Sequence, residues 1–586
     1  MPPAPKKIKS KSTKSKKKKI VLSAEQKAEN RRKAKIHSLI KAIFKSMGFE
    51  YFNTDGKDLV VGKTSSEIDN IFVYKNIILV CEETISHAKE HLRKKNEFYQ
   101  DILQNKQQLI DFLKNKFPER AGNFIYSAKQ CYIFYIYCSE TKIEEDTQEE
   151  YSSIKYLDLK SLEYFKVVTS SIKLSSINEF FKYLNLDLSQ VGDPSSDTVV
   201  KDIQSAVILP EASSGLPDGV QLITFVMKAS DLMDCSYVFR KDSWNGGSNS
   251  FYQRLIIPSK VESIRKFLAH EKRTFIDNII VSLPADVKFS RIVNDVEIAI
   301  PDMTLDGIKL ESLIIKVPYK INSIGIIDGQ HRVFGHYRGM DTLEPVIEDL
   351  RNKRHLLVTG LYYDKTKFSE QEKRKFESSL FLQINSKHKG VEPALLQYIE
   401  NLKTPNSSVG IAWAVISGLN NRSPFLGEFV MSPLDKTGIK IPTIIKYGLK
   451  DLVELNDNKE TFYKYWTDAD KSKIVGEKFD SDKLDEYIKF CARSLSMYFN
   501  AVKDNFPKTL WTLNNKESRL LSVTSMVAFF QAFSFALEEY KVVKDQPFYK
   551  GKLSTLPTKI DFAAKSFPYV SSQWPDLVKI IKSCWT

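Results

Sequence analysis

Residues 328–332, with the sequence Asp-Gly-Gln-His-Arg, combine side-chain types that bind phosphate groups at a sharp turn. They follow a short apolar run, and a strand that enters a glycine turn and continues as a helix points free backbone N–H groups at one place. Gly329 permits close approach of the backbone, and Arg332 offers a planar guanidinium that suits phosphate. Gln330 and His331 supply further donors. The sequence therefore predicts a phosphate-binding turn.

Asp328 opens this turn, and its carboxylate has three roles open to it. It could coordinate a cation, orient Arg332, or cap the helix that follows. His336 lies five residues after His331, so the two do not share a helix face, which argues against a metal site built from two histidines.

The 328–332 segment closely resembles the signature of the DGQHR-domain proteins, a bacterial family that includes the DndB-type regulators of DNA phosphorothioation and shares its core with ParB and sulfiredoxin. The resemblance continues in order over residues 252–254, 260–268, 275–283 and 384–390. It implies that the turn binds the phosphates of ATP or another nucleotide, as in the sulfiredoxin-like relatives, or that it contacts DNA.

Two further polar patches belong to this resemblance. Gln253 and Arg254 match the family beside the signature turn, so Arg254 either reaches into the same cleft or pairs with an acid beneath it. Asn385, Lys387 and Lys389 carry groups that suit the phosphates of a DNA backbone. The alternative for this last patch is an ordinary solvated loop.

A second candidate site lies in the first third of the chain. Residues 68–73 and 77–81 read as strands, with Asp69 at the start of the first and Glu82 at the end of the second. Adjacent strands would bring the two carboxylates to the same edge of a sheet. Two carboxylates there would suit Mg²⁺, which can activate water against a phosphodiester.

This arrangement looks like the core of the PD-(D/E)xK nucleases, and the resemblance implies that Asp69 and Glu82 are metal ligands. The family's lysine should stand two residues after the glutamate, but that position is Thr84. Lys89 on the following helix is the candidate replacement, with Lys94 as an alternative and His87 as a weaker one. Three outcomes stay open: an active nuclease, an inactive DNA-binding scaffold, or acids that only face solvent.

The residues of the two candidate sites must be positioned by folded domains. Several domains are expected, because a chain of 586 residues exceeds the size at which one hydrophobic core keeps growing. We expect a multidomain α+β or α/β chain: a nuclease-like αβ domain, a ParB/sulfiredoxin-like central domain and a mainly helical C-terminal region. The predicted divisions are a disordered lysine-rich tail at 1–21, the nuclease-like domain at 22–190, the DGQHR domain at 207–420 and the helical region at 421–586.

Local patterns predict the main elements within these domains. The expected helices cover residues 23–47, 87–115, 259–270, 483–502, 518–540 and 577–584, and the expected strands cover 49–52, 68–73, 77–81, 131–138, 155–158, 221–227, 279–283 and 324–327.

Charge is concentrated at the start of the chain. The formal net charge is +15, and residues 1–20 contain nine lysines and no acid. With the basic cluster at residues 31–35, this tract is expected to contact phosphate backbones, although a solubilising tail is the alternative. No C-x-x-C pair indicates zinc, and no apolar run is long enough for a membrane span, so a cytoplasmic protein is expected.

Together these features predict a DNA-binding protein of a DNA modification, restriction or phage-defence system, with other proteins of the same operon as partners. The activity expected first is a Mg²⁺-dependent DNA endonuclease with a nucleotide- or phosphate-binding site. The alternatives are a non-catalytic regulator of DndB type and a ParB-like NTPase that controls DNA engagement.

Overall fold

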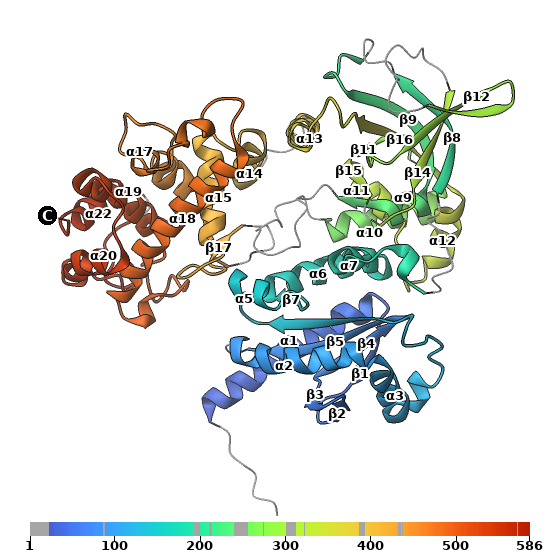
Figure 1. Ribbon diagram of the computed structural model, residues 1–586, viewed down its shortest axis with the longest axis horizontal. Helices are drawn as coiled ribbons and strands as arrows, with labels where there is room; N and C mark the ends of the chain where they lie inside the picture. Colours follow the sequence, from blue (N-terminus) through green and yellow to red (C-terminus); the bar gives the residue numbers. More distant parts are fainter. Residues whose placement is uncertain are drawn as a thin grey trace, which may run out of the picture.

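The chain folds into three regions that follow one another in sequence (Figure 1). The computed structural model describes residues 23–85, 88–192, 200–209, 214–238, 256–273, 275–300, 312–321, 323–385, 393–431, 435, 437–570 and 572–585. The expectation of a mixed α+β chain with several sheets is confirmed. None of the helices in these ranges is both long enough and apolar enough to cross a membrane.

The first region is built on a five-stranded sheet in the order β1-β4-β5-β6-β7, antiparallel from β1 to β5 and parallel from β5 to β7. Strands β2 and β3 form a separate hairpin. The elements are α1 (Ala24–Ser46), β1 (Glu50–Asn53), β2 (Asp58–Val61), β3 (Thr64–Glu67), β4 (Asn70–Tyr74), β5 (Ile77–Thr84), α2 (Ala88–Gln104), α3 (Lys106–Lys116), α4 (Pro118–Ala121), β6 (Tyr132–Ser139), α5 (Glu145–Glu150), β7 (Lys155–Asp158), α6 (Leu159–Ile172), η1 (Lys173–Ser176), α7 (Ile177–Leu184) and η2 (Leu188–Gln190).

Helices cover both faces of this sheet. Side chains of α1, α6 and α7 pack on one face, and those of α2 and α3 pack on the other. Strand β5 can lie between the two layers because it begins with five consecutive apolar residues, Ile77 to Cys81, all of them buried. Alternate residues of β5 therefore face α1 and α2.

One local prediction for this region was wrong in detail, and one element was missed. The single helix expected over 87–115 is two helices, because the chain turns at Asn105. The hairpin of β2 and β3 was not predicted, since its strands have only four residues each and β3 contains no apolar residue.

The central region contains a nine-stranded sheet in the order β10-β15-β11-β16-β9-β8-β14-β12-β13. The predicted strands at 221–227, 279–283 and 324–327 correspond to β9, β11 and β15, and the predicted helix at 259–270 corresponds to α10. The elements are β8 (Val200–Leu209), β9 (Val220–Lys228), α9 (Ala229–Cys235), β10 (Ser236–Val238), α10 (Pro258–Glu271), β11 (Ile279–Ser282), β12 (Lys288–Val293), β13 (Val296–Ile300), β14 (Ser312–Pro318), β15 (Ile324–Asp328), α11 (Gln330–Phe334), α12 (Glu344–Lys353), β16 (His355–Tyr363) and α13 (Glu370–Asn385).

The described residues from Pro393 onward are mainly helical, and this includes α14 and α15, which lie before the predicted boundary at residue 421 but pack into the C-terminal core. The elements are α14 (Pro393–Lys403), α15 (Ser408–Leu419), β17 (Phe429–Val430), β18 (Ile439–Lys440), α16 (Ile441–Ile444), η3 (Ile445–Leu449), α17 (Phe462–Tyr465), η4 (Lys471–Ile474), α18 (Ser481–Asp504), η5 (Lys508–Leu510), α19 (Val523–Tyr540), α20 (Gln546–Lys552), η6 (Leu553–Thr555), α21 (Leu556–Lys559) and α22 (Trp574–Lys582).

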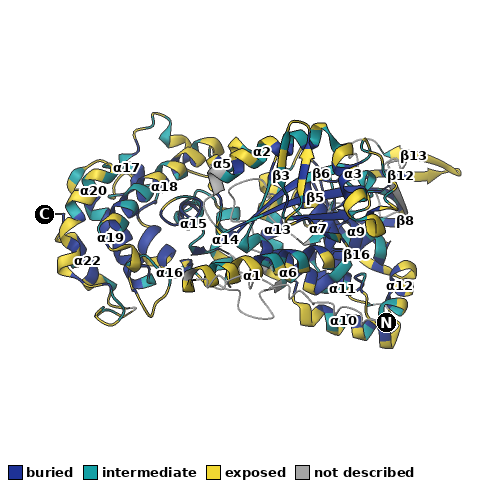
Figure 2. Ribbon diagram, turned by 90° about the horizontal axis from the view of Figure 1, so that it is seen from below, coloured by how far each residue is buried: buried dark blue, intermediate teal, exposed yellow. Residues whose placement is uncertain are grey.

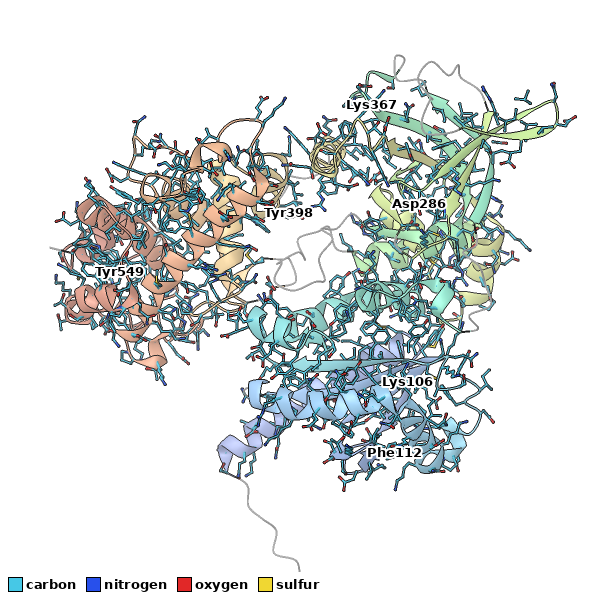
Figure 3. All side chains as sticks on the ribbon, in the orientation of Figure 1. Lys106, Phe112, Asp286, Lys367, Tyr398 and Tyr549 are labelled. Atoms are coloured by element: carbon cyan, nitrogen blue, oxygen red, sulfur yellow. The ribbon has the colours of Figure 1, made fainter. Side chains whose placement is uncertain are left out.

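Two apolar cores organise most of the molecule (Figure 2). One belongs to the C-terminal helices, where Tyr398 and Tyr549 are buried at well-separated places (Figure 3). The other is shared between the first and central regions: Phe180 of α7 and Met233 of α9 belong to the same buried cluster. The first and central regions are therefore packed together through apolar side chains.

Candidate active site on the first sheet

The structure brings Asp69 and Glu82 together at one edge of the first sheet. Strands β4 and β5 pair with Asn70 opposite Cys81, so Asp69 lies opposite Glu82 one step beyond the last pair. The Asp69 carboxylate also accepts a hydrogen bond from the backbone N–H of Glu83, with a Glu83 N to Asp69 Oδ2 distance of 2.7 Å. Both carboxylates are therefore fixed at the edge that their positions in the sequence predict.

A lysine does reach this pair, and it is Lys95. Its Nζ lies 2.7 Å from Glu82 Oε1 and also donates to the backbone carbonyl of Glu67. The Glu82 side chain is 2% exposed and that of Lys95 is 14% exposed, so this ion pair is largely screened from water. Lys94 is exposed instead. Lys89 belongs to α2, but its side chain lies outside the described residues.

Helical periodicity could have identified Lys95. Leu92 and Tyr99 on α2 are buried against the sheet, and Lys95 stands between them at helical spacing, three residues after the first and four before the second. The signal is a lysine on an otherwise apolar stripe of a helix, where that stripe faces a strand that ends in acidic residues. Lys94, one residue before Lys95, lies off this stripe.

The electrostatics of the site favour a bound cation. Burial, and next the nearby Asp69 carboxylate, raise the pKa of Glu82 to about 8, although Lys95 acts in the opposite direction. Burial, followed by Asp69 and then Glu82, raises the pKa of Glu83 to about 8 as well. Three neighbouring acids thus repel one another, and a positive ion would relieve that repulsion.

Glu83 belongs to a second polar group on the opposite face of the same strand. Its Oε1 lies 3.3 Å from His37 Nδ1 on α1 and accepts a hydrogen bond from the Asn70 side-chain amide. The His37 Nε2 atom lies 3.3 Å from the Tyr51 hydroxyl oxygen. Alternation along β5 therefore directs Glu82 toward α2 and Glu83 toward α1.

The residues present fit a single hydrated Mg²⁺ ion better than a closed metal cage. Within the described ranges, no group of three or more His, Cys, Asp or Glu residues is arranged to hold a metal. Mg²⁺ commonly uses one or two carboxylates and completes its shell with water and substrate phosphate oxygens. Asp69 and Glu82 would supply those two carboxylates.

Because its pKa is raised in the folded protein, Glu82 gives the metal-free protein a pH-dependent stability. As the pH rises from about 4.5 to about 8, the unfolded chain releases its proton before the folded chain does, so the free energy of unfolding falls. Replacing Glu82 with glutamine should stabilise the metal-free protein by roughly 1–3 kcal/mol at a pH of about 8.5 and much less at about 5. Thermal unfolding at both pH values measures this difference.

The exposed neighbour Glu97 provides the control, since Glu97→Gln should shift the unfolding temperature little at either pH. Equal effects of the two substitutions, or a Glu82→Gln protein that is less stable at the higher pH, would contradict the raised pKa of Glu82.

The signature turn of the central region lies between β15 and α11. Gly329 has a φ of +95°, and a Cβ atom there would lie 3.1 Å from Ile279 and 3.2 Å from Arg332, so glycine is required by both conformation and space. Gly329 itself occupies the N-cap position of α11, and no side-chain capping bond is formed. The capping role considered for Asp328 is therefore wrong.

Asp328 instead holds Arg332. The Arg332 Nη2 to Asp328 Oδ2 distance is 2.9 Å, and Arg332 Nη1 lies 3.7 Å from Asp277 Oδ2. The Arg332 side chain is mostly buried. Of the alternatives left open for Asp328, orientation of the arginine is the one that the geometry supports.

The remaining signature residues have different surroundings. The backbone N–H of Ile257 donates to His331 Nε2 at 3.1 Å, and Gln330 is buried. His336 is fully buried, and burial lowers its pKa to about 4. The predicted residues Gln253, Arg254, Lys387 and Lys389 and the side chain of Asn385 lie outside the described residues.

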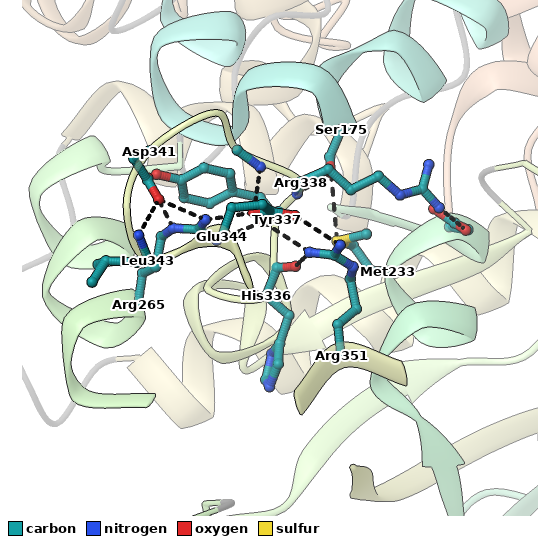
Figure 4. A network of polar contacts seen from close by, with 12 residues as sticks. Ser175, Met233, Arg265, His336, Tyr337, Arg338, Asp341, Leu343, Glu344 and Arg351 are labelled. Atoms are coloured by element: carbon teal, nitrogen blue, oxygen red, sulfur yellow. Dashed lines mark hydrogen bonds and ion pairs between the residues drawn. The ribbon is translucent and has the colours of Figure 1, made fainter. Parts of the chain in front are cut away.

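The segment after the turn is anchored by two buried arginines (Figure 4). Arg265 donates to the carbonyl oxygen of Tyr337 at 2.6 Å and pairs with Glu344 at 2.6 Å and with Asp341 at 3.1 Å. Arg351 pairs with the same Glu344 carboxylate at 2.9 Å. This network fixes the path of the chain that leaves α11.

The same segment contacts the first region. The backbone N–H of Arg338 donates to the Ser175 hydroxyl at 2.8 Å, and the backbone N–H of Leu174 donates to the Arg338 carbonyl at 3.2 Å. The Arg338 guanidinium pairs with Asp234 of α9 at 2.7 Å. A continuous path of hydrogen bonds therefore joins the chain after the signature turn to η1.

Comparisons with protein-family models, with curated proteins and with solved structures found no match to this chain.

Proposed function

We propose that this protein is a Mg²⁺-dependent DNA nuclease whose site consists of Asp69, Glu82 and Lys95. The observation that carries the proposal is the 2.7 Å contact between Lys95 and Glu82 beside Asp69. Lys95 supplies from α2 the positive charge that the lysine of the PD-(D/E)xK pattern would supply from β5, where this chain has Thr84. The arrangement supports the interpretation of the first region as a PD-(D/E)xK-like domain.

The proposed chemistry follows from the charges of these residues. Asp69 and Glu82 would hold Mg²⁺, which when bound lowers the pKa of a coordinated water and so supplies a nucleophile. Lys95 places a positive charge at the site, where it stabilises the negative charge that develops on the phosphate during cleavage. The backbone N–H of Glu83 holds the Asp69 carboxylate in place.

The surroundings of the site support DNA as the substrate. The first half of α1 is exposed and contains five basic residues between Lys27 and Lys35 against Glu29 and one further acid. Arg32 of this half lies 3.3 Å from Glu140, which directly follows β6. Since β6 is parallel to β5, the basic half of α1 passes close to the edge that carries Glu82, where phosphate groups would be attracted.

The first test is incubation of the purified chain with supercoiled plasmid and Mg²⁺, with and without ATP, beside an Asp69→Ala variant. Nicking or linearisation that requires both Mg²⁺ and Asp69 is the expected result. If the protein retains the DNA on a gel but does not cleave it, the nuclease hypothesis is excluded and the non-catalytic regulator of DndB type is supported. Normal cleavage by the Asp69→Ala variant would show that this site does not carry out the reaction.

A second candidate function, nucleotide or DNA phosphate binding at the 328–332 turn, is favoured by the Asp328–Arg332 pair. This pair holds the guanidinium beside a glycine that permits close backbone approach. It supports the proposed kinship with DGQHR-domain proteins, and with it a place in a DNA modification, restriction or phage-defence system. Turnover of the nucleotide would make the chain a ParB-like NTPase.

Replacing Arg332 with alanine is expected to weaken the binding of ATP or of a short DNA duplex by about tenfold or more, because a bidentate contact to phosphate is lost. Titration with a fluorescent ATP analogue and with labelled DNA measures both affinities. Arg273→Ala is the control, since Arg273 is exposed and its described contacts are with the exposed Glu271 and the ring of Phe267, both close to it in sequence. Unchanged dissociation constants for both ligands would exclude the phosphate-binding role.

A further inference from the structure

The hairpin of β12 and β13 projects from the end of the nine-stranded sheet (Figures 1 and 2). Strand β12 pairs with β14 only over Lys288 to Ser290, whereas it pairs with β13 as far as Val293. Asn294 and Asp295 both have positive φ, as in the two-residue turns that close tight hairpins. The outer half of the hairpin is therefore a two-stranded ribbon, which is at best marginally stable without a further strand.

This ribbon exposes apolar side chains that are normally protected. Val296 is 61% exposed, Ile292 is 53% exposed and Ile298 is 43% exposed. Among the strands described, β13 pairs with β12 alone and so forms an edge of the sheet. An exposed apolar edge strand is a template for pairing with another strand.

The charge of the hairpin favours a protein partner over a nucleic acid. Residues 288–300 contain two cations and two acids, so the hairpin has no net positive charge to attract phosphate groups. One of the acids, Glu297, already pairs with Lys316 at 2.8 Å and accepts a hydrogen bond from Ser290. The features left to bind a partner are the exposed apolar side chains and the backbone N–H and C=O groups at the free edge of β13.

We infer that this edge is covered by a second copy of the same chain, with the two β13 strands paired antiparallel about Ile298. In this register Val296 lies opposite Ile300 of the partner subunit, and Glu297 lies opposite Ala299 of the partner subunit. Opposite residues share a face, so Val296, Ile298 and Ile300 of both copies form one apolar stripe, and the two Glu297 carboxylates do not face each other.

The backbone fits the same register. The pair Val293–Val296 flanks a two-residue turn and therefore exchanges both ladder hydrogen bonds, after which the pattern alternates along the strands. Glu297 and Ala299 then direct their N–H and C=O groups to the free edge. In the twofold arrangement these groups bond to one another across the interface, which is the self-complementarity that a closed dimer requires.

Cysteine crosslinking tests the register. All six native cysteines are buried, so an introduced thiol is the accessible one. Ile298→Cys places two thiols directly opposite each other, within the distance that a disulfide needs, and should give a covalent dimer under mild oxidation. Val296→Cys is the control: its side chain is more exposed, but its counterpart would lie four residues away along the interface, so it should stay monomeric on a non-reducing gel.

Solution mass tests the dimer itself, without any dependence on nuclease activity or nucleotide binding. Analytical ultracentrifugation of the full chain should give a dimer, Ile298→Lys should give a monomer, and Val570→Lys, at an exposed residue elsewhere, should remain a dimer. A monomeric wild type would overturn the inference, and it would do so even if the hairpin bound a different protein. A dimer that Ile298→Lys leaves intact and that Ile298→Cys does not crosslink would overturn it too.

Discussion

Replacing Lys95 with methionine is expected to lower the rate of Mg²⁺-dependent DNA cleavage by about 100- to 1000-fold, because the site loses the positive charge that stabilises the reacting phosphate. Methionine keeps most of the aliphatic contact of lysine with the sheet. DNA affinity should change by less than about twofold, since one lysine is a small part of the basic surface. Single-turnover cleavage and gel retention on the same duplex separate the two quantities.

Lys94→Met is the matched control for this experiment. It removes the same charge one residue earlier on α2, but the Lys94 side chain is exposed whereas Lys95 contacts Glu82. Both substitutions lower the net charge equally, so a long-range effect would appear in both. If Lys94→Met reduced cleavage as strongly as Lys95→Met, the local role of Lys95 would be wrong.

Replacing Arg265 with methionine is expected to lower the free energy of unfolding by about 3–5 kcal/mol. The Arg265 side chain is fully buried, and its removal leaves Asp341 without its arginine and Glu344 with Arg351 as its remaining ion-pair partner. The carbonyl oxygen of Tyr337 also loses its 2.6 Å hydrogen bond. Chemical denaturation measures the loss.

The neighbouring Lys266 gives the control, because it lies on the same helix but is 60% exposed and pairs only with the exposed Glu262 among the contacts described. Lys266→Met should change stability by less than about 0.5 kcal/mol. A loss for Arg265→Met as small as that of Lys266→Met would show that the buried network contributes little beyond what a well-packed apolar side chain supplies. In that case its role would be to set the path of residues 336–341.

The sequence was sufficient for those parts of the site that depend on strand ends. The positions of Asp69 and Glu82 at the start and end of neighbouring apolar runs predicted their shared edge, because antiparallel pairing leaves little freedom once β4 and β5 form. The same holds for the glycine turn after β15. Lys95 was not predicted, because proximity to Thr84 in sequence does not decide which lysine of α2 faces the sheet, whereas the buried stripe of the helix does.

Contacts between distant segments could not be predicted in this way. The pairing of Glu83 with His37 joins α1 to β5, and it depends on how α1 lies across the sheet. The bonds of Arg338 to Ser175 and Asp234 depend on the docking of two regions. Periodicity along one element reports which side is apolar, but it does not report which element will cover that side.

The apolar core shared by the first and central regions has a consequence for how this chain can be rearranged. Phe180 precedes and Met233 follows residues 191–206, which separate the two predicted domains in sequence, yet the two side chains are buried in one cluster. Neither region carries a complete core of its own on the side where they meet. Recombination that transplanted either region alone would leave a bare apolar face on it, so the first sheet and the signature turn are expected to be exchanged as one unit.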